Sequence, residues 1–191
     1  MLTRHPAGAT QQGSEPEREA PVGRVYLLRH AKSSWDDPDE ADLRRPLAPR
    51  GRKAVKALER HLRAMDVALD LVLCSPAVRA VQTWDGVASG LPPGTPVEFD
   101  AAVYHAGSGD LLGRLRRLPP EIDSVLVLGH NPGLADLALG LVAAGDPHLR
   151  TRLETKFPTG ALASLEVAVT WHDLRWGTAT LVAYVVPRDL A

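Results

Sequence analysis

The stretch Val25-Tyr26-Leu27-Leu28-Arg29-His30-Ala31 joins an apolar run to a cation and an imidazole. A short run of large apolar residues is typical of a buried strand, so Arg29 and His30 stand at the carboxyl end of that strand. Open α/β proteins place their chemistry at this edge of the sheet. Seen alone, an Arg-His pair after a strand is usually a surface feature, and its meaning depends on the rest of the chain.

Two later apolar runs end in a similar way. Residues 70–74 lead into Ser75-Pro76, with Arg79 one turn further on, and residues 124–128 lead into Gly129-His130-Asn131-Pro132. Ser or Asn followed by Pro is typical of a helix start, so we expect Ser75 and Asn131 to be helix caps. The ends of three strands then offer two arginines and two histidines.

The other segments alternate between helical and strand patterns. Residues 49–65 and 108–118 carry apolar side chains at helical spacing, and residues 97–99 predict a short strand. Residues 161–169 and 178–186 predict a hairpin. Apolar strands that alternate with helices are typical of a parallel sheet covered on both faces. We therefore predict a three-layer α/β/α fold with a mainly parallel central sheet and an antiparallel C-terminal hairpin at its edge.

The length of 191 residues and the 45% hydrophobic content predict one ordinary globular domain, residues 23–191. Residues 1–22 are polar and rich in Gly, Pro, Gln and Glu, which predicts a disordered N-terminal tail. Residues 31–49 form a long loop rich in Asp and Pro, and loops of this length are often functional.

Composition excludes several classes of protein. A net charge of −1 without a basic stripe argues against nucleic-acid binding. The sequence has neither a membrane-length apolar stretch nor the apolar core of a signal peptide, and we expect a cytoplasmic protein. The single cysteine, Cys74, ends an apolar run and is predicted to be a buried thiol. No Cys and His spacing indicates a zinc site, and we expect no metal and no cofactor.

The candidate chemistry comes from the strand ends together. If the three strands are parallel and adjacent, His30, Arg79 and His130 meet in one crevice beside helix N-termini, which favour an anion. The forked donors of Arg29 and Arg79 suit the oxygens of a phosphoryl group. A neutral imidazole can then act as the nucleophile, and the absence of a Gly-rich phosphate loop agrees with metal-free transfer.

These residues resemble the histidine phosphatase superfamily, which includes phosphoglycerate mutase-like enzymes, and in particular its small SixA-type phosphohistidine phosphatase branch. The resemblance covers about residues 24–188. It rests on six short motifs: Leu28-Arg29-His30-Ala31, Arg45-Pro46-Leu47 with Gly51, Ser75-Pro76-Ala77 with Arg79 and Thr83, Val103-Tyr104-His105-Ala106, Gly129-His130-Asn131-Pro132, and Phe157-Pro158-Thr159-Gly160.

The resemblance implies a role for each residue of the crevice. His30 is implied as the nucleophile that becomes phosphohistidine, Arg29 and Arg79 as ligands of the phosphoryl oxygens, and His130 as a hydrogen-bond donor to the transition state. The implied fold is the mainly parallel sheet between helices described above.

Three further residues are candidate substrate-binding residues, each with an alternative role. Ser33 follows the proposed nucleophile and is otherwise a solvated loop residue. Arg45 lines the pocket rim or fixes the loop, and Asn131 contacts substrate or caps a helix. Tyr104 is expected in the core with its hydroxyl near the rim, and His105 is expected on the surface.

The chain differs from the larger members of the family in its general acid. Those members carry an acidic residue in a mid-chain insertion, and this sequence has no clear match to it. Asp100 lies in the corresponding region, shortly before Tyr104, and is the candidate acid. The loop residues Asp36, Asp37 and Asp42 are weaker candidates that we expect to be solvated. Because an alkoxide leaves poorly without a proton donor, the missing acid favours phosphohistidine or activated phosphoesters as substrates. The branch also often has Asp where this chain has Arg44.

The sequence therefore predicts a metal-independent phosphatase that hydrolyses phosphohistidine or small phosphoesters through a phosphohistidine intermediate on His30. One alternative is a phosphoglycerate mutase-like phosphotransferase, which the short chain disfavours. Another is a non-catalytic phosphate- or phosphoprotein-binding module, which would not need a histidine nucleophile. The expected partners are a phosphorylated small molecule or a phosphohistidine protein, and the expected state is a monomer or weak dimer.

Overall fold

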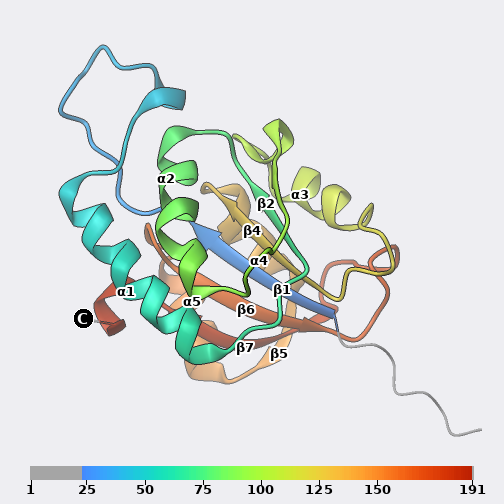
Figure 1. The fold of residues 1–191 in the computed structure, drawn as a ribbon. Helices are drawn as coiled ribbons and strands as arrows, with labels where there is room; N and C mark the ends of the chain where they lie inside the picture. The colour runs from blue at the N-terminus through green and yellow to red at the C-terminus, as the bar shows by residue number, and fades with distance from the viewer. Residues whose placement is uncertain (1–22, 191) are drawn as a thin grey trace, which may run out of the picture.

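The structure is a computed structural model that describes residues 23–190, so the predicted tail, residues 1–22, lies outside the described residues. Its centre is a seven-stranded sheet with the strand order β3-β2-β4-β1-β6-β7-β5 (Figure 1). The strands are β1 (Gly23–Arg29), β2 (Leu71–Cys74), β3 (Val97–Phe99), β4 (Ser124–Gly129), β5 (Val142–Gly145), β6 (Leu162–Val167) and β7 (Ala179–Val185).

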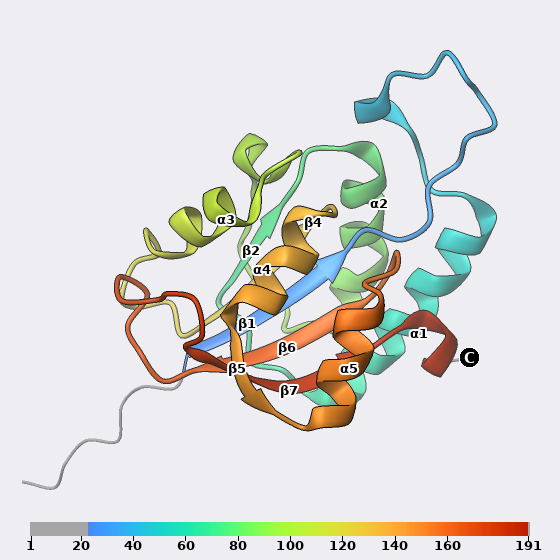
Figure 2. The ribbon, with the colours of Figure 1, turned by 180° about the vertical axis from the view of Figure 1, so that it is seen from behind.

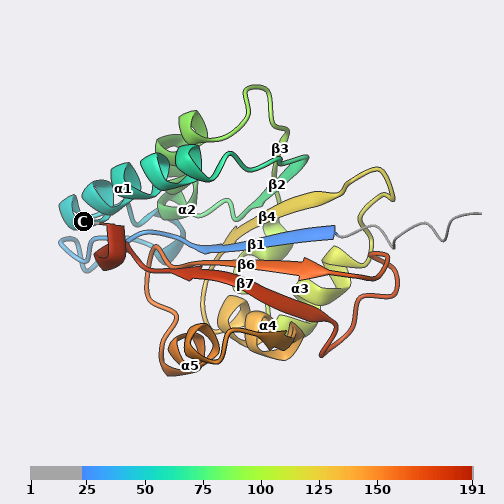
Figure 3. The same ribbon diagram turned by 90° about the horizontal axis from the view of Figure 1, so that it is seen from below.

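Five α-helices of the described residues cover the two faces of the sheet. They are α1 (Pro49–Met65), α2 (Val78–Val87), α3 (Ser108–Leu115), α4 (Gly133–Leu141) and α5 (Pro147–Thr155). Figure 3 shows α1 and α2 on one face and the other three on the opposite face, and Figure 2 shows α4 and α5 in front of the sheet. The predicted three-layer α/β/α fold is thereby confirmed.

Alternation along the strands produces a separate core on each face of the sheet. Leu27 of β1 joins the cluster that includes Leu134 of α4, whereas the next residue, Leu28, joins the cluster that includes Leu58 of α1. Successive strand residues point to opposite faces, and here both faces are covered. This is the physical reason why residues 25–28 form an unbroken apolar run.

Strand pairing is parallel on one side of β1 and antiparallel on the other. β1 pairs with β4, β4 with β2 and β2 with β3, all in parallel. β6 pairs antiparallel with both β1 and β7, which confirms the predicted hairpin. The sequence did not predict β5, which pairs in parallel outside β7. Three of its four residues are small and exposed, so they carry no apolar pattern.

One edge of the sheet collects the ends of five strands. The carboxyl ends of β1, β2 and β4 lie there, because these three strands are parallel and in register. The start of β6 lies beside the end of β1, where Leu28 pairs with Leu162, and Leu162 in turn pairs with Val185 at the end of β7. Residues 31–48 form a long loop beyond this edge, with a short 3-10 helix, η1 (Asp42–Arg44).

No helix in residues 23–190 is long and apolar enough to cross a membrane.

Candidate active site

His30 directly follows β1 and is buried, with 7% of its surface exposed. Its Nδ1 lies 2.7 Å from the carbonyl oxygen of Ala31. A carbonyl oxygen can only accept a hydrogen bond, so Nδ1 carries the proton and Nε2 carries a free lone pair. Burial, together with the nearby Arg79 and Arg29 charges, lowers the pKa of His30 to about 4. His30 is therefore neutral at neutral pH and has the tautomer that a nucleophile needs.

His130 follows β4, and its ring centroid lies 5.0 Å from that of His30. The Arg79 guanidinium donates to Nδ1 of His130 over 3.3 Å, which leaves the His130 proton on Nε2. That Nε2–H donates to the Ser75 hydroxyl oxygen over 2.7 Å. Burial and the neighbouring His30 and Arg79 lower the pKa of His130 to about 3. Two neutral imidazoles thus lie side by side at the sheet edge.

The two arginines of the site are held in different ways. Arg79 of α2 is buried and donates to both the carboxylate and the backbone carbonyl of Asp42. Arg29 donates to the carbonyl oxygen of Phe157 over 2.8 Å, and its buried Nε has no hydrogen-bond partner among residues 23–190. Burial and the Arg79 charge lower the pKa of Arg29. Positive charge at the edge is therefore only partly neutralised, a condition that favours an anionic ligand.

The structure corrects both predicted helix caps. α2 begins at Val78 and α4 at Gly133, and neither helix has a side-chain cap. The Ser75 hydroxyl accepts from the Ala77 amide in a tight turn and from His130, so it orients the imidazole. The Asn131 side chain turns away from the helix and donates to the Phe157 carbonyl over 2.9 Å.

The Phe157 carbonyl is a positioning group that sequence reasoning did not identify. It accepts from Arg29 and Asn131, which come from two different strand ends. The segment is fastened to the site by Gly160, whose amide donates to the carbonyls of Arg29 and His30 over 3.0 and 3.1 Å. Gly160 has a φ of +76°, which favours glycine. The sequence feature that could have indicated a role for this segment was the motif Phe157-Pro158-Thr159-Gly160.

Asp42 lies in the site, which corrects the solvated position expected from the sequence. Its carboxylate contacts Arg79 over 2.8 Å, the Tyr104 hydroxyl over 2.8 Å and Arg45 over 2.9 Å. Burial raises its pKa, but the hydrogen bonds from Tyr104 and Arg79 outweigh that effect and hold the pKa well below its ordinary value. Asp42 is therefore ionised and occupies donors that a phosphoryl group could use.

Arg45 and Ser33 are buried and bonded to each other within the loop. Arg45 donates to the Ser33 hydroxyl over 2.8 Å and to the Ser34 carbonyl over 3.1 Å. Its guanidinium carbon lies 3.2 Å from the ring centroid of Trp35, which is largely exposed. These contacts support the loop-fixing role for Arg45, and the substrate contacts of Ser33 and Arg45 remain predictions.

Two other residues make contacts that the sequence did not predict. His105 is exposed, as predicted, but its ring stacks 6.1 Å from His130 and its Nε2 lies 3.5 Å from the Asp42 carboxylate, so it belongs to the rim. Asp100, the candidate acid, accepts from Arg114 over 2.8 Å, and this hydrogen bond lowers its pKa. An ionised carboxylate tied to Arg114 does not fit the role of proton donor.

Thr83 connects the nucleophile segment to α2. Its hydroxyl accepts from the Ala31 amide over 3.0 Å and donates to the Arg79 carbonyl over 2.6 Å. Residues 23–190 contain no group of three His, Cys, Asp or Glu side chains placed to hold a metal ion. The site thus consists of two imidazoles, two guanidinium groups and one intruding carboxylate.

Comparisons with known proteins agree with this arrangement. The profile of the histidine phosphatase superfamily (branch 1) matches residues 25–122. An uncharacterized protein of Mycobacterium tuberculosis is 38% identical over 163 residues, which span 84% of this chain and all of that protein.

Two solved structures are also similar. A protein assigned as the phosphohistidine phosphatase SixA of Nakamurella multipartitia has 28% identity and a TM-score of 0.77, with 89% of this chain and 99% of that chain covered. The protein histidine phosphatase SixA complexed with tungstate has 26% identity and a TM-score of 0.72, with 88% and 99% covered. The chain therefore belongs to branch 1 of the histidine phosphatase superfamily and is a phosphatase.

Proposed function

We propose that this phosphatase hydrolyses phosphohistidine or activated phosphoesters through a phosphohistidine intermediate on His30. The observation that carries the proposal is the hydrogen bond from His30 Nδ1 to the Ala31 carbonyl, which leaves Nε2 free. A lowered pKa keeps that nitrogen unprotonated at neutral pH. His130 and Arg79 lie beside it, and Arg29 precedes it in the chain.

The reaction takes two displacements at phosphorus. In the first, the Nε2 lone pair of His30 forms a bond to phosphorus, and the leaving group departs with the electron pair of its broken bond. In the second, water attacks the phosphohistidine, the N–P bond returns its pair to Nε2, and inorganic phosphate is released with a water proton lost to solvent. Arg29 and Arg79 stabilise the charge on the equatorial oxygens in both steps.

His130 supports the same transition states in this proposal. A bound dianionic phosphoryl group raises the pKa of a neighbouring imidazole, so Nδ1 of His130 takes up a proton from solvent. Nδ1 then no longer accepts from Arg79 and instead donates a hydrogen bond to a phosphoryl oxygen. Its Nε2–H is meanwhile held by Ser75, which sets the direction in which Nδ1 points. Ser75 is thus a positioning residue.

The proposed substrate class follows from the two candidate acids in the described part of the chain, neither of which is placed as a proton donor. Hydrogen bonds from Tyr104 and Arg79 lower the pKa of Asp42, and one from Arg114 lowers that of Asp100, so neither carboxylate supplies a proton to an alkoxide. A protonated imidazole or a phenolate leaves without such help. The similarity to SixA proteins supports a phosphohistidine substrate, and the tungstate complex of one of them supports oxyanion binding in this fold.

We further propose that the enzyme works without a metal, as a monomer or weak dimer in the cytoplasm. Support for the last point comes from the single cysteine, Cys74, which lies buried in β2 as a free thiol. Burial raises the pKa of that thiol to about 12, so it is inert in the reaction.

The test measures phosphate release by the wild type and by His30→Ala in the presence of EDTA. The substrates are p-nitrophenyl phosphate and a phosphohistidine peptide. We expect activity that survives EDTA and falls by at least about 10³-fold in His30→Ala, because the nucleophile is lost. His148→Ala is the matched control, since it removes an exposed histidine of α5. Activity retained by His30→Ala overturns the mechanism, and activity abolished by EDTA overturns metal independence.

A further inference from the structure

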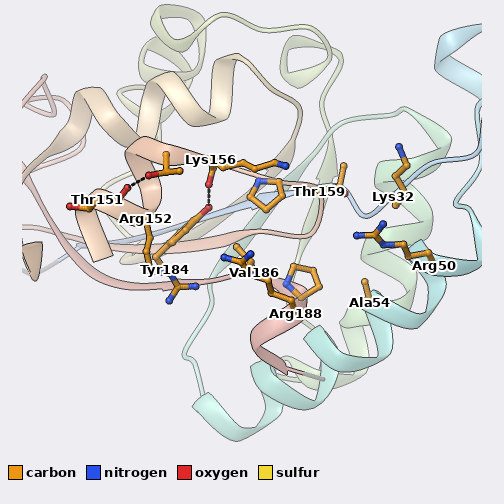
Figure 4. A pocket seen from close by; sticks show the side chains of 13 residues that line it. Lys32, Arg50, Ala54, Thr151, Arg152, Lys156, Thr159, Tyr184, Val186 and Arg188 are labelled. Atoms are coloured by element: carbon orange, nitrogen blue, oxygen red, sulfur yellow. Dashed lines mark hydrogen bonds between the residues drawn. The ribbon is translucent and has the colours of Figure 1, made fainter. Parts of the chain in front are cut away.

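A concavity lies against the segments on either side of the nucleophile and takes no part in the chemistry above. It has a volume of about 380 Å³ and lies between the first turns of α1, the α5–β6 connection and the segment after β7 (Figure 4). Ala54, Pro158 and Val186 contribute its apolar lining. We call this concavity the basic groove, for the five cationic side chains that also line it: Lys32, Arg50, Arg152, Lys156 and Arg188.

The basic groove opens on the same edge of the sheet as the active site. Val186 directly follows β7, whose end pairs with the start of β6, and that start pairs with the end of β1. Lys32 lies two residues after His30, and Thr159 precedes Gly160, whose amide donates to the His30 carbonyl. Lys32 and Thr159 both line the groove, so one wall of the groove is built on the segments that hold the nucleophile.

The charge of the groove is one-sided. No Asp or Glu is among the described residues that line it. Arg152 is paired with Asp189 and lies over the Tyr184 ring, and Arg188 is 3.9 Å from the same carboxylate. The other three cations, Lys32, Arg50 and Lys156, form no ion pair within residues 23–190.

Two of the free cations point toward the groove from opposite walls. Figure 4 shows Arg50 reaching in from α1 and Lys156 from the α5–β6 connection, whereas the Lys32 side chain extends away from Arg50. Like charges on the two walls repel each other, so an anion between them is favourable. The Tyr184 hydroxyl donates to the Lys156 carbonyl, which ties the base of that wall to β7.

We propose that the basic groove binds a second anionic group, phosphate or carboxylate, carried by the leaving group of a small-molecule substrate. This inference rests on the proposed function, because it assigns the groove to the part of the substrate that departs from phosphorus. The volume lies within the range of sites for small molecules, and the apolar lining suits a carbon framework between the two anionic centres. The substrate class is an aryl or otherwise activated phosphate with an anionic substituent.

The test compares aryl phosphates that differ only in a second charge. Phenyl phosphate is compared with phenyl phosphates that carry a para carboxylate on a short or a longer alkyl spacer. We expect a higher kcat/KM for one carboxylate substrate, and we expect Arg50→Gln combined with Lys156→Gln to reduce that preference roughly fivefold to tenfold. The preference also falls as salt is raised, since the cations are exposed.

The matched control is Lys56→Gln combined with Arg60→Gln, which removes two exposed charges of α1 outside the groove lining. It leaves both activity and preference unchanged. Equal kcat/KM values for all three substrates overturn the groove proposal while the His30 mechanism stands. The proposal is also overturned if the groove variant loses activity toward a phosphohistidine peptide only, because the groove then binds protein.

A binding measurement separates failure of the groove from failure of the proposed function. Calorimetric titration of His30→Ala with the same three aryl phosphates needs no turnover. The groove proposal is supported if a carboxylate substrate binds more tightly than phenyl phosphate and if adding Arg50→Gln and Lys156→Gln to His30→Ala abolishes that difference. This holds even if no substrate is hydrolysed. Equal binding of all three compounds overturns the proposal.

Discussion

The intruding carboxylate of Asp42 is the most consequential single residue that the structure adds to the site. It contacts Arg79, Arg45 and Tyr104 at distances of 2.8 to 2.9 Å, and it comes from a loop that reaches over the sheet edge. A carboxylate on a guanidinium fork uses donors that also suit a phosphoryl group. Asp42 and the substrate therefore compete for Arg79.

We predict that Asp42→Asn binds inorganic phosphate more tightly, with an inhibition constant roughly threefold to tenfold lower. The reason is that an amide competes weakly for Arg79, whereas the ionised carboxylate competes strongly. The measurement is inhibition of p-nitrophenyl phosphate hydrolysis by phosphate. Asp36→Asn is the control, because only the backbone amide of Asp36 forms a described hydrogen bond. Weaker phosphate binding by Asp42→Asn shows instead that the carboxylate orients Arg79.

The protonation state of His30 yields a second prediction at the residue scale. Because burial lowers its pKa to about 4, Nε2 is available well below the ordinary histidine range. We predict that protonation of His30 in the free enzyme does not limit kcat/KM from pH 7 to about pH 5 and lowers it as the pH drops through about 4. A pH profile of kcat/KM for p-nitrophenyl phosphate, corrected for the ionisation of the substrate itself, checks this. An acid limb centred near 6.5 contradicts it.

At the scale of elements, the start of α1 is packed against the segment that follows the nucleophile. A β-carbon at Gly51 would lie 2.1 Å from the Lys32 carbonyl oxygen, which is backbone and cannot move aside easily. The Ala48 amide donates to the same carbonyl over 2.9 Å. The glycine thus sets how closely α1 approaches residues 31–33, and with them one wall of the basic groove.

We predict that Gly51→Ala lowers the free energy of unfolding by about 2 kcal/mol, the cost expected for overpacking. Replacing glycine by alanine within a helix ordinarily raises the free energy of unfolding. A decrease in this variant therefore indicates that α1 lies too close to the Lys32 carbonyl to accept a β-carbon. Urea denaturation measures the effect, and Lys53→Ala on an exposed position of α1 is the control. A more stable Gly51→Ala variant shows that α1 can shift without cost.

At the scale of the whole molecule, the buried histidines couple stability to pH. The pKa values of His30 and His130, about 4 and about 3, lie below the ordinary value of 6.5. Below pH 6.5 the unfolded chain binds protons that the folded chain does not, so protonation favours unfolding. The two histidines therefore leave the free energy of unfolding independent of pH above about 6.5, and they lower it progressively as the pH falls toward 4.

We predict that His30→Gln combined with His130→Gln makes the loss of stability between pH 6.5 and pH 4 shallower than in the wild type. Chemical denaturation at several pH values measures the slope. The control variant, His148→Gln with His172→Gln, replaces exposed histidines and leaves the slope near that of the wild type. Equal slopes in all three proteins contradict the assignment of His30 and His130 as neutral buried groups.

Patterns within single segments determined much of the fold in advance. The periodicity of residues 49–65 predicts α1 with its observed bounds, and the apolar run 25–28 predicts the strand that carries His30. These signals are strong because the Val and Leu residues of each segment follow the repeat of a single helix or strand and are buried by the sheet or its covering layers. β5 was missed because its small, exposed residues have no such repeat.

The sequence by itself therefore determined the layered fold and the order in which His30, Arg79 and His130 follow their strands. Only the tertiary structure decided that Ser75 and Asn131 bond to His130 and Phe157 rather than cap helices, and that Asp42 lies on Arg79. It alone also showed the basic groove. The physical reason is that periodicity and capping are local, whereas these contacts join residues 26 to 55 positions apart and depend on how loops and helices pack over the sheet edge.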